Sequence, residues 1–164
     1  MFTVNLQNND LPKSLRYKEL ATTLSALLDN EREFLPNMSN MASFLYFSLN
    51  DINWCGFYLV KNGDLLLGPF QGKPACVRIE IGKGVCGTSA QNRDSVIVED
   101  VNNFPGHIAC DVDSRSEIVI PLLKDGKLLG VLDIDSPTLA RFDQEDKMGL
   151  EKLVSILLEH SDCY

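Results

Sequence analysis

A predicted β-hairpin near the C-terminal end of the chain limits the possible folds more than any other feature. Its arms are residues 116–123 and 127–135, two largely apolar runs that flank the dipeptide Asp125-Gly126. Asp-Gly favours a tight turn in which both residues have positive φ, and such a turn joins adjacent antiparallel strands. The sequence therefore predicts an antiparallel sheet that contains this hairpin.

The rest of the chain predicts further strands and helices around this sheet. β-rich runs divided by turn residues lie at residues 52–60, 64–70, 75–81 and 95–100. Asn62-Gly63, between the first two runs, predicts a second hairpin turn. Apolar stripes of helical spacing lie at residues 17–28, 34–49 and 150–158, and residues 84–92 suit a short helix. Asp143 is the expected N-cap of the last long helix. Helices packed on an antiparallel meander make an α+β layer fold, expected here as one domain over residues 1–164 with a flexible segment at residues 1–12.

The charge balance and the N-terminal segment argue against several classes of protein. Fifteen Lys and Arg against 23 Asp and Glu give a net charge of −8, so no basic patch favours a nucleic-acid or anionic-membrane partner. The sequence has no run of 18 apolar residues, and its N-terminus lacks a basic region followed by an apolar one. We therefore expect a cytoplasmic protein, in a reducing compartment where its five cysteines do not form a disulfide scaffold.

One cysteine, Cys110, lies in a polar segment where packing does not explain it. The segment, residues 101–115, is 15 residues long and has little periodicity. Loops of that length in compact domains are usually functional or disordered. Cys110 stands beside Asp111 and near Asp113, so we favour it as a functional thiol. A protease-like pairing with His107, three residues away, stays open as an alternative.

The other four cysteines lie in contexts that range from the core to the end of the chain. Cys55 lies within an apolar strand and is expected in the core, whereas Cys163 lies at a frayed C-terminus and is expected to be idle. Cys76 and Cys86 flank a glycine-rich turn and stay open between packing and function. A zinc site is not favoured, because closed zinc sites use closely spaced ligand pairs.

An acidic cluster is predicted at the end of the hairpin. Asp133 and Asp135 follow an apolar run and project to the same side of a regular strand. Glu117 opens the partner strand, but a strict two-residue turn would pair it with Ile134 and point it to the other side. A bulge near Pro121, which cannot donate to the ladder, would turn Glu117 toward the aspartates. The cluster therefore depends on that irregularity.

Five segments of the chain resemble one known family. They are NWCGFYLV, LLLGPFQGKPACVRIEIGKGVCG, FPGHIACD, SEIVIPL and GVLDIDSP, and they are similar to the free methionine-(R)-sulfoxide reductases, a catalytic branch of the GAF-domain fold. The similarity covers roughly Trp54 to Leu158. It implies a GAF-like α+β fold with a central antiparallel sheet of about six strands flanked by helices, often as a homodimer.

The resemblance also implies roles for individual residues. The cysteine in the position of Cys110 is the nucleophile, and those at Cys76 and Cys86 are resolving or auxiliary thiols. The substrate pocket is formed by the residues that match Trp54, Tyr58, Glu117, Asp133 and Asp135. No bound cofactor or metal is implied, and a thioredoxin-type system, supplied by NADPH, returns the disulfide to the dithiol.

The chemistry of sulfoxide reduction explains these residue types. A thiolate attacks the sulfoxide sulfur and the oxygen is protonated, which yields a thioether and a cysteine sulfenic acid that a second thiol converts to a disulfide. Clustered carboxylates do not all ionise near neutral pH, so one can donate to the oxygen while an ionised one holds the substrate ammonium group. Trp54 and Tyr58, four apart on one face of a strand, could wall the pocket.

Two questions stay open at this level. Between the two candidate resolving thiols we favour Cys76, because GPFQGKPAC is a turn-rich, mobile approach to it. Cys86 would then line the pocket or act as a reserve. The alternative to an enzyme is a non-catalytic GAF module that binds a small ligand, or that senses redox state through its thiols.

Overall fold

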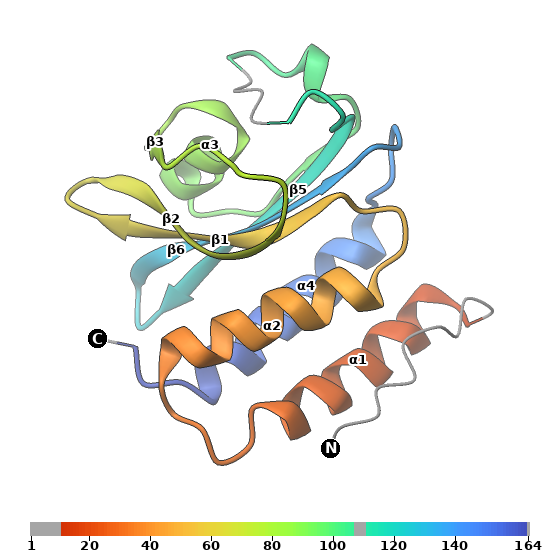
Figure 1. The fold of residues 1–164 in the computed structure, drawn as a ribbon, viewed down its shortest axis with the longest axis vertical. Helices are drawn as coiled ribbons and strands as arrows, with labels where there is room; N and C mark the ends of the chain where they lie inside the picture. The colour runs from red at the N-terminus through yellow and green to blue at the C-terminus, as the bar shows by residue number, and fades with distance from the viewer. Residues whose placement is uncertain (1–10, 107–110, 164) are drawn as a thin grey trace.

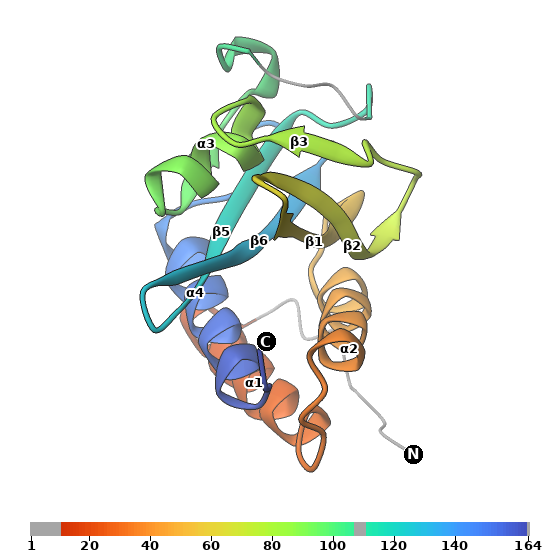
Figure 2. The same ribbon diagram turned by 90° about the vertical axis from the view of Figure 1, so that its left-hand side faces the viewer.

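A β-sheet has long helices on one side and a short helix on the other (Figures 1 and 2). The computed structural model describes residues 11–106 and 111–163, so the segment predicted as flexible lies almost entirely outside the described residues. Within these residues the sheet has six strands in the order β3-β2-β1-β6-β5-β4, with every neighbouring pair antiparallel. The strands are β1 Trp54–Lys61, β2 Asp64–Gly72, β3 Arg78–Glu80, β4 Val96–Val98, β5 Ser116–Lys124 and β6 Lys127–Ser136. The predicted α+β fold is confirmed.

The long helices all lie on one side of the sheet, and two of them pack directly on its strands. They are α1 Lys13–Leu27, α2 Phe34–Ser48 and α4 Gln144–Glu159, while the short α3, Gly84–Asn92, lies on the opposite face (Figure 2). Asp143 caps α4 as predicted, because its side chain accepts from the backbone N–H groups of Glu145 and Asp146. Across the described part of the chain, none of these helices has the length and apolar character that a membrane crossing requires.

Alternate side chains of the strands enter two separate cores, one on each face of the sheet. Ile118 of β5 and Leu132 of β6 are fully buried in the core against α1, α2 and α4. Their neighbours Val119 and Val131 are fully buried in the core against α3. Cys55 lies in the helical-side core with no exposed surface, which confirms its predicted packing position. Both faces of the sheet are therefore apolar over most of their area.

The predicted hairpin turns are present. Asp125 and Gly126 have φ values of 51° and 74°, and Asn62 and Gly63 have values of 55° and 89°. Two consecutive residues with positive φ are the conformation that Asn-Gly and Asp-Gly favour in two-residue hairpins.

A β-bulge next to the Asp125-Gly126 turn sets the register of β5 against β6. Leu122 pairs with Gly130, but the next residue, Leu123, pairs with Leu128, so Leu129 is the extra residue. The irregularity predicted from the sequence therefore exists, but it lies in β6, near the turn, and the proline of β5 pairs in register. Because side chains alternate along a strand, one extra residue moves every residue beyond it to the opposite face.

The edge strand β3 is shorter than the predicted run of residues 75–81. Its ladder to β2 ends where the N–H of Leu67 donates to the carbonyl of Val77 at 2.9 Å. Beyond that point β2 carries Pro69, which has no N–H to donate, and one extra residue relative to β1. Cys76 consequently lies in the connection between β2 and β3, and the prediction that placed it in a strand is wrong.

Cys163 is held in place, contrary to the prediction of a frayed end. It is half-buried against the helical-side core, and its Sγ lies 3.8 Å from Nζ of Lys124. The preceding residue, Asp162, donates its backbone N–H to the carbonyl of Arg32 at 2.8 Å and forms a parallel bridge with Glu33. These contacts join the last described residues to the start of α2.

Candidate functional site

The β5–β6 register brings three carboxylates onto one face of the sheet. Glu117 pairs directly with Asp135, and Asp133 lies two residues earlier on the same strand. Residues two apart on a strand share a face, so all three side chains point away from the long helices and toward α3. Glu117 and Asp133 are buried, whereas Asp135 is half-buried. The bulge thus produces the acidic cluster that the sequence left conditional.

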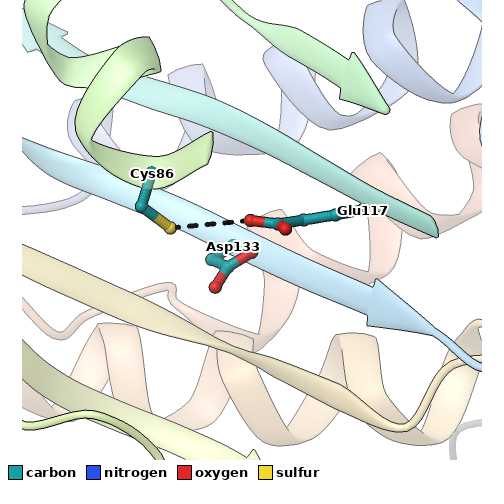
Figure 3. Close-up of side chains that lie close together, drawn as sticks. All are labelled: Cys86, Glu117 and Asp133. Atoms are coloured by element: carbon teal, nitrogen blue, oxygen red, sulfur yellow. Dashed lines mark hydrogen bonds between the residues drawn. The ribbon is translucent and has the colours of Figure 1, made fainter. Parts of the chain in front are cut away.

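Helix α3 adds a thiol to this cluster. Figure 3 shows the side chain of Cys86 reaching down from α3 toward Glu117 on β5 and Asp133 on β6. Its Sγ lies 3.9 Å from Oε1 of Glu117, and donor atoms of all three residues lie within 4.8 Å of one another. These are also the residues, within the described ranges, whose donor atoms are grouped closely enough to hold a metal ion.

A glycine allows α3 to approach the sheet closely enough to place Cys86. A Cβ on Gly87 would lie 2.4 Å from the carbonyl oxygen of Glu80 at the end of β3. The carbonyl of Gly87 also accepts from the N–H of Gly82 at 2.8 Å. Gly87 disfavours a helix by propensity, but it is the residue that lets this helix pack.

Aromatic rings form one wall of the site. Trp54 and Tyr58, both on β1, lie with ring centroids 6.0 Å apart and planes inclined by 25°, and Phe70 of β2 stacks on Trp54 at 5.3 Å. The indole N–H of Trp54 donates to the carbonyl of Lys73 at 3.1 Å. The hydroxyl of Tyr58 donates to the carbonyl of Cys76 at 2.9 Å. The wall is therefore tied at two points to the segment that carries Cys76.

The carboxylates, the thiol and the aromatic wall line one pocket. Its described lining residues are Trp54, Tyr58, Pro74, Ala75, Ile79, Lys83, Gly84, Val85, Cys86, Asp111, Ser114, Glu117, Asp133 and Asp135. The structure thus brings together Cys86 and all five predicted substrate-pocket residues. Cys110 and His107 lie outside the described residues, so their predicted roles stay predictions.

Sequence reasoning missed a polar network at the rim of this pocket. The amide of Asn53 donates to Oδ2 of Asp111 at 3.3 Å and to Oγ of Ser114 at 3.1 Å. Nζ of Lys73 lies 3.2 Å from Oδ1 of Asp111 and also forms an ion pair with Asp113. The network joins the start of β1, the β2–β3 connection and the loop before β5. Asp111 and Asn53 adjoin Cys110 and Trp54 in the sequence, which is the signal that could have identified them.

Burial keeps protons on the carboxyl cluster. Loss of solvation raises the pKa of Glu117 well above its ordinary value, and the charges of Asp133 and Asp135 raise it further. Burial also raises the pKa of Asp133 to about 6, and burial together with the charge of Asp133 raises the pKa of Asp135. Near neutral pH the cluster therefore holds both a proton to donate and negative charge to bind a cation.

The described cysteines differ in chemical state. Burial, followed by the charges of Asp133 and Glu117, raises the pKa of Cys86 well above that of an ordinary thiol, so Cys86 is a poor nucleophile. Cys55, Cys86 and Cys163 are free thiols, whereas Cys76 is disulfide-bonded.

Comparisons with known proteins agree on one family. The GAF domain family profile matches residues 19–158. The free methionine-R-sulfoxide reductase of Escherichia coli is 50% identical over 141 residues, which are 86% of each chain. The enzyme of the same name from Saccharomyces cerevisiae is 44% identical over 162 residues, covering 94% of this chain and 89% of the relative.

A solved structure of the same kind matches nearly the whole fold. The free methionine-R-sulfoxide reductase from Neisseria meningitidis, in complex with its substrate, superposes with a TM-score of 0.92 at 40% identity. The match covers 98% of this chain and 95% of that chain.

Proposed function

Because this chain belongs to the free methionine-R-sulfoxide reductase family of GAF domains, we propose that it reduces free L-methionine-(R)-sulfoxide to methionine with Cys110 as nucleophile. The observation that carries this proposal is the group of Glu117, Asp133 and Asp135, which lines one pocket together with Trp54. Such a pocket offers a proton donor, an anion and an apolar wall.

The proposed reaction has two covalent steps. The Cys110 thiolate attacks the sulfoxide sulfur, the oxygen is transferred to the cysteine as it gains a proton, and methionine leaves with Cys110 as a sulfenic acid. A second thiol then attacks the sulfenic sulfur, which forms a disulfide and releases the oxygen as water. The sulfoxide is reduced by two electrons and two thiols are oxidised, so an external dithiol must restore them.

We assign the proton to Glu117 and the charge to the aspartates. Glu117 is buried between two acids, which is the setting that most favours its neutral form. A neutral carboxyl can donate a hydrogen bond to the sulfoxide oxygen and strengthen it as that oxygen gains negative charge. The pKa of Asp133 is raised only to about 6, so Asp133 can be ionised near neutral pH beside the substrate ammonium group. A bound ammonium group would also favour ionisation of the nearest aspartate.

The aromatic wall suits the thioether end of the substrate. Trp54 is buried, and its ring stacks with those of Tyr58 and Phe70, so its orientation is fixed. Sulfur and methyl groups pack favourably on such rings. A fixed ring beside fixed carboxylates would admit one arrangement of oxygen, methyl group and lone pair at the chiral sulfur, which supports discrimination between the two epimers.

Cys76 is proposed as the resolving thiol. Two observations support it: Cys76 is disulfide-bonded while Cys86 is free, and the acids around Cys86 disfavour its thiolate. Cys76 also lies in an irregular connection, which makes a change of position less costly than it would be in a strand. The proposal pairs it with Cys110 and leaves Cys86 as a pocket residue. We also propose that a thioredoxin-type system, supplied by NADPH, recycles the enzyme. The proposal further includes a single domain, a homodimer and a cytoplasmic location.

A coupled assay tests this function. With thioredoxin, thioredoxin reductase and racemic free methionine sulfoxide, NADPH consumption should stop when half of the substrate is used, because one epimer reacts. A Cys110→Ser variant should give no turnover and should still bind methionine. Binding without turnover by the native chain would instead identify a ligand-binding GAF module, and equal use of a peptide-bound sulfoxide would refute the preference for the free amino acid.

A further inference from the structure

The thiol of Cys86 and the carboxylates of Glu117 and Asp133 have a spacing that a tetrahedral metal ion requires. With Zn–S of ~2.3 Å and Zn–O of ~2.0 Å, neighbouring sulfur and oxygen ligands of tetrahedral zinc lie roughly 3.5 Å apart. Sγ of Cys86 and Oε1 of Glu117 lie 3.9 Å apart, and the three donor atoms lie within 4.8 Å of one another. Side-chain rotations that move the carboxylate oxygens by up to about one ångström would therefore bring the donor atoms to the spacing of a tetrahedral site.

A second observation points to a ligand in this place. Oδ1 of Asp133 is fully buried and has no hydrogen-bond partner among the described residues. The residue as a whole is only 6% exposed, and Figure 3 shows its carboxylate beside the contact between Cys86 and Glu117. A buried carboxylate oxygen without a partner is costly, and a cation would satisfy it.

The three ligands come from three rigid elements. Cys86 lies on α3, Glu117 on β5 and Asp133 on β6, and a glycine contact fixes the distance of α3 from the end of β3. Ligands held by packed secondary structure need little reorganisation to bind. Asp135 lines the same pocket, so Asp135 or a water molecule could supply the fourth ligand.

We propose that Cys86, Glu117 and Asp133 form a site for one divalent cation of the zinc class, which binds in place of substrate. One thiolate and two carboxylates make a borderline-soft donor set, which selects zinc or cobalt over magnesium or calcium. The metal would occupy the carboxylates assigned above to the sulfoxide oxygen and the ammonium group. The site itself needs only the geometry described here, whereas its competition with substrate rests on the proposed function.

Binding must release protons. A thiol binds a metal as its thiolate, so Cys86 must lose its proton when the metal binds. The affinity should therefore rise with pH, and the heat of binding should change with the ionisation enthalpy of the buffer.

Cobalt is a suitable probe, because a cobalt–thiolate bond gives a near-ultraviolet charge-transfer band. Anaerobic titration of the whole chain with Co²⁺ should give this band with one equivalent bound, and Zn²⁺ should abolish it by displacement. Cys86→Ser should lose the band and bind the metal at least about 100-fold more weakly, since loss of a ligand exceeds the effect of losing a supporting contact. Cys163→Ser, which removes a free thiol elsewhere, should titrate like the native chain.

Two further arms keep the test decisive. Asp133→Asn retains the thiol, so it should keep the band at saturation but require at least about 10-fold more metal; it serves if Cys86→Ser fails to fold. A band that survives in Cys86→Ser, or that disappears only in Cys110→Ser, would place the metal elsewhere and overturn the proposal.

Free methionine should displace cobalt. Metal binding that methionine does not affect would leave the metal site intact and contradict the proposed use of the pocket.

Discussion

Asp133→Asn should stabilise this protein while it lowers activity. Asp133 is buried among acids and its carboxylate has an oxygen without a partner among the described residues, so its ionised form is disfavoured in the folded state. Asparagine has nearly the same shape, accepts hydrogen bonds through its oxygen and carries no charge. The substitution therefore removes an electrostatic penalty without leaving a cavity.

The raised pKa sets both the sign and the size of the effect. Unfolded, the Asp133 carboxyl ionises near 3.8, and folded it ionises at about 6. Between these values the folded state holds more protons than the unfolded state, so the free energy of unfolding falls as pH rises. A difference of about two pKa units corresponds to about 3 kcal/mol of stability. The native chain has lost this stability once the pH exceeds the pKa of Asp133 in the folded state. Below the unfolded value no penalty exists.

Chemical denaturation at a series of pH values measures this directly. At about pH 8 the free energy of unfolding of the variant should exceed that of the native chain by up to about 3 kcal/mol. Near pH 4 the two values should be nearly equal. Activity with free methionine sulfoxide should fall at least about 10-fold, since Asp133 belongs to the proposed pocket. A variant that is less stable than the native chain at pH 8 would refute the reasoning and make Asp133 a structural residue.

Another buried aspartate provides the matched control. Asp146, 1% exposed, accepts from the hydroxyl of Tyr17 at 2.8 Å and forms ion pairs with Lys13 at 2.5 Å and with Arg141 at 3.4 Å. Its charge is compensated, so Asp146→Asn should cost about 1–3 kcal/mol at neutral pH. The same substitution should thus have opposite effects at the two sites.

Three further predictions concern the thiols and the helical layer. Cys110→Ser should abolish turnover in the coupled assay, whereas Cys163→Ser should keep nearly full activity; normal activity of the first would remove the nucleophile assignment. Cys76→Ser should perform a single turnover and leave a sulfenic acid on Cys110, which a sulfenic-acid label and mass spectrometry would detect, whereas a disulfide between Cys86 and Cys110 would show that Cys86 resolves. Gly149→Ala should lower the melting temperature, by an overpacking cost of about 1–3 kcal/mol, because its Cβ would lie 2.1 Å from the ring of Tyr17. Its kcat per folded molecule should stay unchanged, and a reduced kcat would show that the helical layer influences the site.

Local sequence chemistry predicted the elements of the fold well. The Asn62-Gly63 and Asp125-Gly126 turns, the Asp143 cap and the alternation along β6 each follow from a preference of a few neighbouring residues. Cys55 was placed correctly for the same reason, since an apolar strand has a buried face.

Features that depend on distant partners were predicted less well. The bulge was expected at Pro121, but Pro121 pairs in register with Val131 and the extra residue is Leu129, beside the turn on the partner strand. Cys76 was placed in a strand, since its own segment alternates, and only the proline in the facing strand shows why pairing stops there. The rim network of Asn53, Asp111 and Ser114 joins segments about 60 positions apart, which no local pattern reveals.

The two cores on opposite faces of the sheet allow the chain to change in two independent ways. Within the described residues, no side chain of the helical-side core also lines the pocket. Descendants of this sequence can therefore adapt to a new growth temperature by repacking α1, α2 and α4, while the pocket keeps its shape. Selection for a new substrate would act instead on every second position of β1, β5 and β6 and on α3. A library randomised on one face only should accordingly separate thermal adaptation from changes in specificity.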